Sequence, residues 1–427
     1  MKVLIVGGGG REHAIALKIK ENPEVTALYA APGNGGIAQI ATCLPFKATD
    51  VDGIVRWAAE NKVDFVIVAP DDPLCLGMVD ALAEQGIPAF GPRKNAAIIE
   101  GSKVFSKNLM KKYGIPTAAY ETFDDYDEAV KYLQTADMPI VVKADGLALG
   151  KGVLICPDRE SAVEAVASMM KEAKFGASGA RVVIEEFLTG PEVSVLAFTD
   201  GKTVKPMASS MDHKRALDHD EGLNTGGMGT IAPNPCYTPE LARRCMDEIF
   251  LPTIAAMNAE GRTFTGCLYF GLMMTPKGPK VIEYNCRFGD PETQVVLPLL
   301  KSDLLTIMRA TVDGTLADTP VEFASGAACC VVLASGGYPV SYKSGYPISG
   351  LDEAGKTATV FHAGTKLVDG QIVTAGGRVL GVTATADTLE AAIDKAYQAA
   401  DKITFTDMHM RRDIGQRALA SRKESHS

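Results

Sequence analysis

The stretch Val281-Ile282-Glu283-Tyr284-Asn285-Cys286-Arg287-Phe288-Gly289-Asp290-Pro291-Glu292 carries the strongest signal of fold and site in the sequence. Alternate residues of a strand share one face, so Glu283, Asn285 and Arg287 point the same way. A carboxylate and an amide oxygen suit Mg2+ held partly by nucleotide phosphates, and Arg287 can neutralise charge on a transferring phosphoryl group. A strand with one polar face is the plain alternative, but it does not need the turn that Gly289-Asp290-Pro291 forces.

A glycine-rich segment, residues 143–153, precedes this stretch in the chain. Three residues separate Gly146 from Gly150, and Gly152 follows Lys151, so the spacing does not fit a Walker loop. The pattern predicts a flap between two antiparallel strands that folds its backbone over phosphates, with Lys143 reaching the phosphate oxygens. The alternative is an ordinary glycine-rich hairpin with surface lysines.

An apolar strand that ends in acids lies between these two segments, at residues 182–188. Its end offers backbone groups for an adenine edge, and Glu192 offers a carboxylate for ribose hydroxyls. Glu185 and Glu186, taken alone, fit the alternative of a solvated strand end.

A run of four glycines, residues 7–10, ends the first strand and opens a helix before Arg11. Backbone N–H groups and a helix N-terminus suit a phosphate. A dinucleotide fingerprint fits poorly, because its third glycine is missing and no acid follows the second strand. A phosphomonoester site and a simple tight turn both remain open. The polar loops at residues 212–215 and 224–229 are weaker candidates for substrate contacts.

Strands and helices alternate over the first hundred residues, which predicts a parallel sheet. Longer connections follow, as in α+β folds. We expect strands at residues 2–6, 25–31, 65–69, 87–90, 140–143, 153–155, 182–187, 266–274, 280–285, 327–333, 360–367 and 378–384. We expect helices from residue 12, at 50–61, 74–85, 103–113, 125–135, 159–171, from 239, and at 389–400. The polar tail from residue 421 is expected to fray.

Composition excludes several classes of protein. The formal net charge is −9 and basic residues do not cluster, which argues against nucleic-acid binding; Arg411-Arg412 is expected to be solvated surface. Nine cysteines without a C-x-x-C pair fit neither a disulfide framework nor a zinc site, and they favour the cytoplasm. No apolar run approaches the roughly 18 residues of a membrane span.

The glycine flap, the acid-ended strand and the Glu-x-Asn-x-Arg strand, in this order, resemble the ATP-grasp superfamily. Further strings narrow the resemblance to the phosphoribosylamine–glycine ligase family, at residues 7–14, 31–34, 101–103, 143–153, 212–214, 224–229, 283–292, 362–365 and 413–415. This resemblance spans essentially the whole chain. It implies ATP-dependent ligation of glycine to 5-phosphoribosylamine through a glycyl phosphate, in purine synthesis, with Mg2+ or Mn2+.

The resemblance also implies an architecture. The fold would be α/β and α+β multidomain, with an N-terminal parallel α/β (pre-ATP-grasp) domain at residues 1–100. An ATP-grasp domain would follow at 101–320, with a small lid subdomain at about 118–190, and a C-terminal mixed β/α domain would occupy 321–427. The partners would be small molecules only, with no nucleic acid or membrane, and the chain would be a monomer or a weak homo-oligomer.

By the same resemblance, Arg287 and Lys143 would be catalytic, and Glu283 and Asn285 would bind the metal. The residues that would bind ATP are Lys103, Lys143, Gly146, Gly150, Gly152, Glu185, Glu186, Phe187, Leu188 and Glu192. Those that would bind the other substrates are Gly9, Gly10, Arg11, Pro32, Gly33, Asn34, Asp212, Lys214, Asp290 and Glu292.

Two features depart from the pattern of the family. Asp71-Asp72 stands where relatives often carry a glutamate, which leaves the ribose contact there open. The strand at residues 268–272 has no acid where many superfamily members supply another metal ligand, so water would complete the coordination. A different ATP-grasp ligase or carboxylase, and a non-catalytic nucleotide sensor, are the competing functions.

Overall fold

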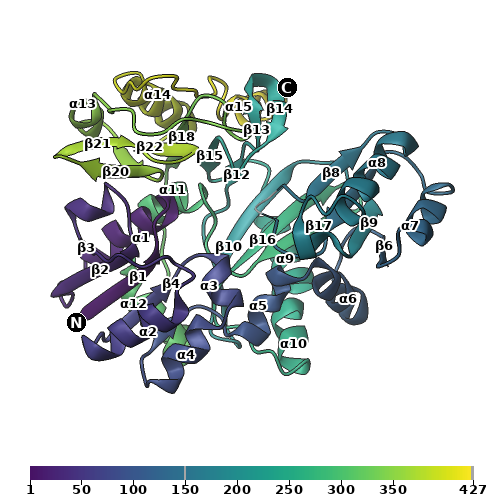
Figure 1. Cartoon of the computed structure of the whole chain (residues 1–427), viewed down its shortest axis with the longest axis horizontal. Helices are drawn as coiled ribbons and strands as arrows, with labels where there is room; N and C mark the ends of the chain where they lie inside the picture. Colours follow the sequence, from purple (N-terminus) through teal and green to yellow (C-terminus); the bar gives the residue numbers. More distant parts are fainter. Residues whose placement is uncertain (149–150, 425–427) are drawn as a thin grey trace.

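The computed structural model describes residues 1–148 and 151–424 of the 427. Its sheets form three regions, which Figure 1 shows as a purple N-terminal unit, a teal unit on the opposite side and a yellow-green C-terminal unit above the first. No helix within the described ranges is both long and apolar enough to cross a bilayer.

The N-terminal sheet is parallel throughout, with the strand order β3-β2-β1-β4-β5, which confirms the predicted α/β class. Its strands are β1 (Lys2–Gly7), β2 (Ala27–Pro32), β3 (Thr42–Cys43), β4 (Phe65–Val68) and β5 (Ala89–Phe90). The helices of this region are α1 (Gly10–Lys20), α2 (Val51–Glu60), α3 (Asp71–Cys75), α4 (Met78–Glu84) and α5 (Lys94–Gly101). Asp50 caps α2 as predicted, because its side chain accepts from the Gly53 N–H.

Two antiparallel sheets form the middle of the chain, as the longer connections predicted. The lid sheet has the order β6-β9-β7-β8, with β6 (Tyr120–Phe123), β7 (Ile140–Ala144), β8 (Val153–Cys156) and β9 (Val182–Glu186). The central sheet has the order β11-β10-β16-β17, with β10 (Glu192–Thr199), β11 (Val204–Pro206), β16 (Gly266–Thr275) and β17 (Gly278–Asn285). The helices here are α6 (Lys103–Tyr113), α7 (Tyr126–Leu133), α8 (Arg159–Met170), α9 (Pro239–Cys245) and α10 (Leu251–Ala259).

The C-terminal sheet has the order β12-β15-β18-β22-β19 and recruits strands from the middle of the chain. The strands are β12 (Met211–Asp212), β15 (Gly229–Ala232), β18 (Ala327–Ala334), β19 (Thr359–His362) and β22 (Arg378–Ala386). Two separate hairpins pair β13 (Arg215–Leu217) with β14 (Glu221–Asn224) and β20 (Thr365–Val368) with β21 (Gln371–Thr374). The remaining helices are α11 (Thr293–Val296), α12 (Leu304–Asp313), α13 (Leu351–Gly355), α14 (Leu389–Ala400) and α15 (Gln416–Glu424).

Three predicted elements differ from the structure. The helix expected at residues 74–85 is broken by Gly77, whose φ of +88° belongs to the left-handed region, so α3 and α4 are separate. The strand expected at 360–367 is broken after His362, where β19 ends; β20 then pairs with β21 in a different sheet. The tail does not begin at residue 421, because α15 continues to Glu424.

The expectation that Arg411 lies at the solvated surface is wrong. Its side chain is 1% exposed. The guanidinium donates from Nε and Nη2 to Asp413, at 2.8 and 2.9 Å, and from Nη1 to Asp220 and the Arg215 carbonyl. Two carboxylates and a carbonyl therefore replace water around this charge, which is the condition for burying an arginine.

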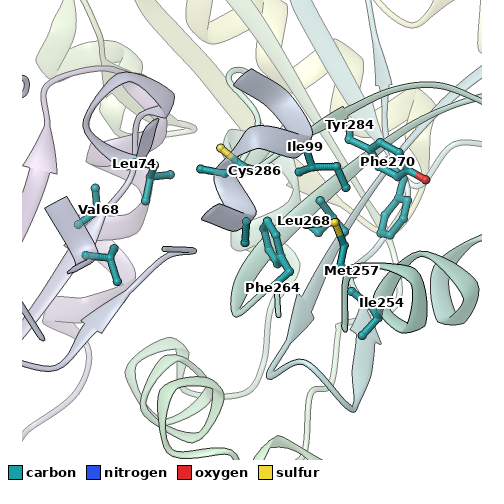
Figure 2. Packing of buried hydrophobic residues seen from close by; sticks show 14 of the residues in the cluster. Val68, Leu74, Ile99, Ile254, Met257, Phe264, Leu268, Phe270, Tyr284 and Cys286 are labelled. Carbon is teal, nitrogen blue, oxygen red and sulfur yellow. The ribbon is translucent and has the colours of Figure 1, made fainter. Parts of the chain in front are cut away.

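One hydrophobic core joins the N-terminal sheet to the central sheet. Figure 2 shows Val68 and Leu74 on one side, Leu268 and Phe270 of β16 on the other, and Cys286 between them. Each fully buried side chain of this size contributes about 1.5–3 kcal/mol. The two regions therefore form one platform beneath the site.

A histidine pair fixes α1 against the C-terminal sheet. His13 Nδ1 accepts from the His362 backbone N–H at 2.7 Å, and the two rings meet edge-on with centroids 5.5 Å apart. Burial lowers the pKa of His13 to about 3 and that of His362 to about 4. Both side chains are therefore neutral in the folded protein at neutral pH.

We expect the stability of the fold to decrease on mild acidification because of this pair. The unfolded chain protonates histidine near its ordinary pKa, about 6.5, whereas the folded chain does not, so stability is complete above that pH and is lost as the pH falls toward about 4. One such histidine costs about 2 kcal/mol at about pH 5. Urea unfolding at about pH 7.5 and pH 5 measures the loss. In His13→Asn the amide oxygen can still accept from His362 without titrating, so this variant should lose less; an equal loss would contradict the assignment.

Candidate active site

A large cavity of about 990 Å³ has walls from the lid sheet, the central sheet and the C-terminal sheet. It brings together most of the predicted site residues from distant parts of the sequence. Those that line it are Arg11, Lys103, Lys143, Gly152, Glu185, Glu186, Phe187, Leu188, Glu192, Asp212, Lys214, Glu283, Asn285, Arg287, Asp290 and Glu292.

The end of β17 presents Glu283 and Asn285 to this cavity. Lys214 Nζ lies 3.6 Å from Glu283. Burial alone would raise the pKa of the Glu283 carboxyl, but Lys214, Lys143 and Lys103 lower it, so the group is an anion at neutral pH. An ionised carboxylate is the form that binds a divalent cation.

These two residues fit a divalent cation held mainly by other ligands. No cluster of three or more His, Cys, Asp or Glu within residues 1–148 and 151–424 could hold a metal ion. The amide nitrogen of Asn285 donates to Glu100 at 3.0 Å, and no described residue donates to its oxygen. The donor set is thus one carboxylate and one free amide oxygen, which suits Mg2+ that keeps phosphate and water ligands.

Two lysines share one buried carboxylate at the end of the lid sheet. Glu185 is 4% exposed, so the alternative of a solvated strand end is wrong for this residue. Lys107 Nζ lies 2.6 Å from Glu185, and Lys143 forms a second ion pair with it. Burial opposes ionisation, but Lys143 and Lys107 lower the pKa of the Glu185 carboxyl. Lys143 also donates to the Ile282 carbonyl at 3.2 Å, which places it beside the β17 donors.

The N-terminus of α6 anchors the start of the glycine-rich segment. Ser102 caps α6 and donates to Asp145 at 2.9 Å, and the Val104 N–H donates to the same carboxylate oxygen. Lys103 Nζ donates to the Gly146 carbonyl at 3.0 Å. Gly150 lies outside the described residues, so only Gly146 and Gly152 of the predicted flap glycines can be placed.

Arg287 presents a half-buried guanidinium to the same cavity. Its Nη2 donates to Glu100 at 3.0 Å and its Nη1 donates to the Phe288 carbonyl at 3.2 Å. Its Nε has no hydrogen-bond partner among the described residues. A buried donor without a partner is unfavourable unless a ligand supplies the acceptor, so this group favours an anion in the cavity.

Three further acids, Asp212, Asp290 and Glu292, line the same cavity. Burial and then the nearby Glu292 raise the pKa of Asp212, and Tyr269 donates its hydroxyl to Glu292 at 3.0 Å. Burial opposes ionisation of Asp290 as well, but Arg378 and Arg11 lower the pKa of this carboxyl. The arrangement can accept hydrogen bonds from a hydroxylated or cationic ligand.

The N-terminal glycine loop packs against the segment that follows β2. A Cβ on Gly8 would lie 2.4 Å from the Gly33 carbonyl oxygen, so only glycine fits there. Asn34 donates to the carbonyls of Gly8 and His362, at 2.9 and 2.8 Å. Asn34 thus braces the loop against the C-terminal region.

The same loop already uses two of its backbone donors. The Gly9 N–H donates to Glu12 at 2.8 Å and the Arg11 N–H donates to Asp290 at 3.2 Å. The predicted ligand residues Gly9, Gly10, Pro32, Gly33 and Asn34 are not among the residues that line the cavity. Their contact with a phosphate stays a prediction.

Several residues that complete the site have no role in the sequence-based prediction. Lys107 lies one helical turn after Lys103 on α6, and this spacing could have indicated a shared face. Glu100, Tyr269 and Arg378 had no such signal, because each meets the site only through long-range packing.

Comparison with known proteins identifies the chain's relatives. Family models of phosphoribosylglycinamide synthetase match in three parts: the N domain at residues 1–100, the ATP-grasp (A) domain at 101–293 and the C domain at 328–417. A curated phosphoribosylamine–glycine ligase from Halalkalibacterium halodurans is 49% identical over 425 residues, covering 100% of this chain and 99% of that protein.

Two solved structures extend the comparison. The crystal structure of phosphoribosylamine–glycine ligase from Thermotoga maritima matches with a TM-score of 0.86 at 35% identity, covering 97% of this chain and 100% of that one. The biotin carboxylase domain of 2-oxoglutarate carboxylase from Hydrogenobacter thermophilus, solved with MgADP, ADP and bicarbonate, matches with a TM-score of 0.72 at 18% identity. That match covers 96% of this chain and 91% of that one, and it indicates a shared fold only.

Proposed function

This chain belongs to the phosphoribosylglycinamide synthetase family, and from that premise we propose how its residues perform the family's reaction. The reaction uses ATP to join glycine to 5-phosphoribosylamine and gives glycinamide ribonucleotide, ADP and phosphate, a step of purine biosynthesis. One observation supports the roles below most strongly: Glu283, Asn285 and Arg287 line the same cavity as Lys103 and Lys143.

ATP lies, in this proposal, between the lid sheet and the central sheet. Phe187 and Leu188 contact the adenine ring, Glu185 and Glu186 lie at its edge, and Glu192 accepts from the ribose hydroxyls. Lys103 and Lys143 hold the phosphates. Lys143 must then leave its ion pair with Glu185, and Lys107 remains to balance the charge of that carboxylate. Gly146, Gly150 and Gly152 let the flap backbone approach the phosphates.

Glu283 and Asn285 hold Mg2+ or Mn2+ through their oxygens. The bound cation supplies charge neutralisation on the phosphate oxygens. Arg287 acts on the same oxygens, since its Nε–H has no protein acceptor among the described residues. The protein thus contributes position and positive charge, which is what phosphoryl transfer requires, and no protein nucleophile.

Two steps complete the reaction. A carboxylate oxygen of glycine attacks the γ-phosphorus of ATP, the bond to ADP breaks, and glycyl phosphate forms. The amine of 5-phosphoribosylamine then attacks the acyl carbon, loses a proton, and displaces phosphate. Asp212, Lys214, Asp290 and Glu292 contact glycine and the ribose or amine of its partner. The predicted residues Gly9, Gly10 and Arg11, with Pro32, Gly33 and Asn34, hold the phosphate end of that partner.

We expect ADP formation to depend strictly on glycine, and this tests the proposal. In the presence of ATP, Mg2+, glycine and hydroxylamine, the acyl phosphate should be trapped as glycine hydroxamate without phosphoribosylamine. Omission of glycine, or its replacement by bicarbonate, should leave only background ADP. Equal ADP formation with bicarbonate would favour a carboxylase, the activity named for the structural neighbour of similar fold.

We further propose domain boundaries near residues 100 and 320, with the lid at about 118–190.

The odd number of cysteines and the absence of a C-x-x-C pair in the sequence support a cytoplasmic location. A monomer or a weak homo-oligomer remains our expectation for the assembly.

A further inference from the structure

Glu100, at the C-terminal end of α5, is a nearly buried acid that the proposed mechanism leaves without a role. It is 7% exposed, and three donors from the end of β17 and the two residues that follow it converge on it. Oε1 accepts from Asn285 Nδ2 and from Arg287 Nη2, each at 3.0 Å. Oε2 accepts from the Cys286 backbone N–H at 2.8 Å. One carboxylate therefore binds three consecutive residues that follow Glu283 and Tyr284.

These contacts decide which way the Asn285 amide faces. An asparagine side chain has a donor end and an acceptor end, and either can point toward the cavity. Because the NH2 group donates to Glu100, the oxygen faces the cavity, where no described residue donates to it. A flipped amide would present N–H groups to the cation and would direct its oxygen at the Glu100 carboxylate.

Glu100 itself is held by the core. Its neighbour Ile99 is 1% exposed, and Cys286 is fully buried. Figure 2 shows both side chains in the packed region between Leu74 and the strands of the central sheet. The carboxylate therefore lies at a junction that cannot shift without disturbing the core.

We propose that Glu100 is a positioning residue that sets the amide of Asn285 for metal binding and aligns Arg287 beside it. The proposal rests on the metal role assigned to Asn285 under the proposed function. The proposal gives the end of α5 a part in the reaction. Helix α5 leads directly into α6, which carries Lys103, so Glu100 and a phosphate-binding lysine lie on the same bend of the chain.

An exchange of donor and acceptor separates this role from simple support of the core. In Glu100→Gln, one of the two carboxylate oxygens is replaced by an NH2 group. In one orientation this NH2 group faces the donors of Asn285 and Arg287, and in the other it faces the Cys286 N–H. In both cases a donor faces a donor. In the double variant Glu100→Gln with Asn285→Asp, the amide and the carboxylate exchange positions: the amide at position 100 donates to the carboxylate at position 285. The net charge is that of the wild type. The aspartate has oxygens at both ends and needs no orientation.

The readout is the affinity for Mn2+ in the presence of a non-hydrolysable ATP analogue, measured by electron paramagnetic resonance. We expect Glu100→Gln to weaken binding about 10–100-fold, as is common for residues that orient metal ligands. The double variant should return to within about threefold of the wild type. Glu164→Gln, an exposed substitution of the same kind on α8, should change nothing.

Each other outcome has a definite meaning. Unchanged affinity in Glu100→Gln, while Glu283→Gln loses the metal, would overturn the positioning role and leave the proposed function standing. Weakening that the double variant does not reverse would show a structural role only, which also overturns the proposal. Unchanged Mn2+ affinity in both Glu100→Gln and Glu283→Gln would instead refute the metal site. If Glu100→Gln does not fold, the double variant is judged alone, and it must bind Mn2+ like the wild type.

Discussion

Replacement of Glu283 by glutamine is expected to reduce kcat/KM for ligation by about 10³-fold with the fold intact. The substitution keeps the size of the side chain but removes the only carboxylate at the end of β17 that faces the proposed phosphate site. Several kcal/mol of transition-state charge stabilisation depend on the cation it holds. The stability cost is small, about 0–1 kcal/mol, because the ion pair with Lys214 is long and partly exposed.

A coupled assay for ADP, run with glycine and phosphoribosylamine, measures the loss, and thermal unfolding monitors the fold. Glu164→Gln serves as the matched control and should retain full activity. If Glu283→Gln forms product at the wild-type rate, the metal site at the end of β17 is refuted.

Local signals predicted the elements whose ends depend on neighbouring residues. Helix α6 runs from Lys103 to Tyr113, as expected, because Ser102 caps its start and Gly114 closes it at a φ of +68°. Helix α14 likewise begins after Thr388, whose side chain accepts from the Ala391 N–H. Caps and left-handed glycines act within one turn, so they can be read from a single sequence.

Elements that depend on tertiary pairing were less predictable. β12 and β15 pair into the C-terminal sheet about 100 residues before its other strands begin, and no local pattern indicates this. Residues 360–367 look like one strand, but a Cβ on Gly364 would lie 2.6 Å from the Gly376 Cα. The two glycines therefore pack closely at the break between β19 and β20, and only the fold reveals this contact.

The residues of the candidate site also fall into two groups: those that a local sequence pattern predicts and those that only the fold reveals. Glu283, Asn285 and Arg287 follow from strand alternation and from the chemistry of their side chains, and the structure places all three at one cavity. Glu100 could not be found in this manner, since its three donors lie 185 to 187 residues away. The burial of Arg411 was equally out of reach, because a sequence does not show that Asp220 and Asp413 meet it.

Replacement of Arg287 by methionine is expected to lower kcat by about 10³-fold, which is the lower range for loss of an arginine that acts on a transferring phosphoryl group. The variant should also be less stable by about 3–5 kcal/mol, because Glu100 is left buried without its cation. Arg287→Lys keeps a charge but not the planar fork, so its kcat should fall less. Initial rates at saturating ATP, glycine and Mg2+, together with urea unfolding, measure both effects.

The two effects of this change can be separated by removing the partner as well. The double variant Arg287→Met with Glu100→Gln contains no buried charge at this position, and loss of a whole buried pair is often close to neutral for stability. We therefore expect it to regain most of the unfolding free energy while kcat at saturating metal stays low. Arg243→Met, which changes an exposed arginine on α9, is the matched control. If kcat recovered along with stability, Arg287 would support the fold and would not touch the reacting phosphate. A guanidinium that is needed in the transition state is still missing from the double variant, so repaired packing alone cannot restore kcat.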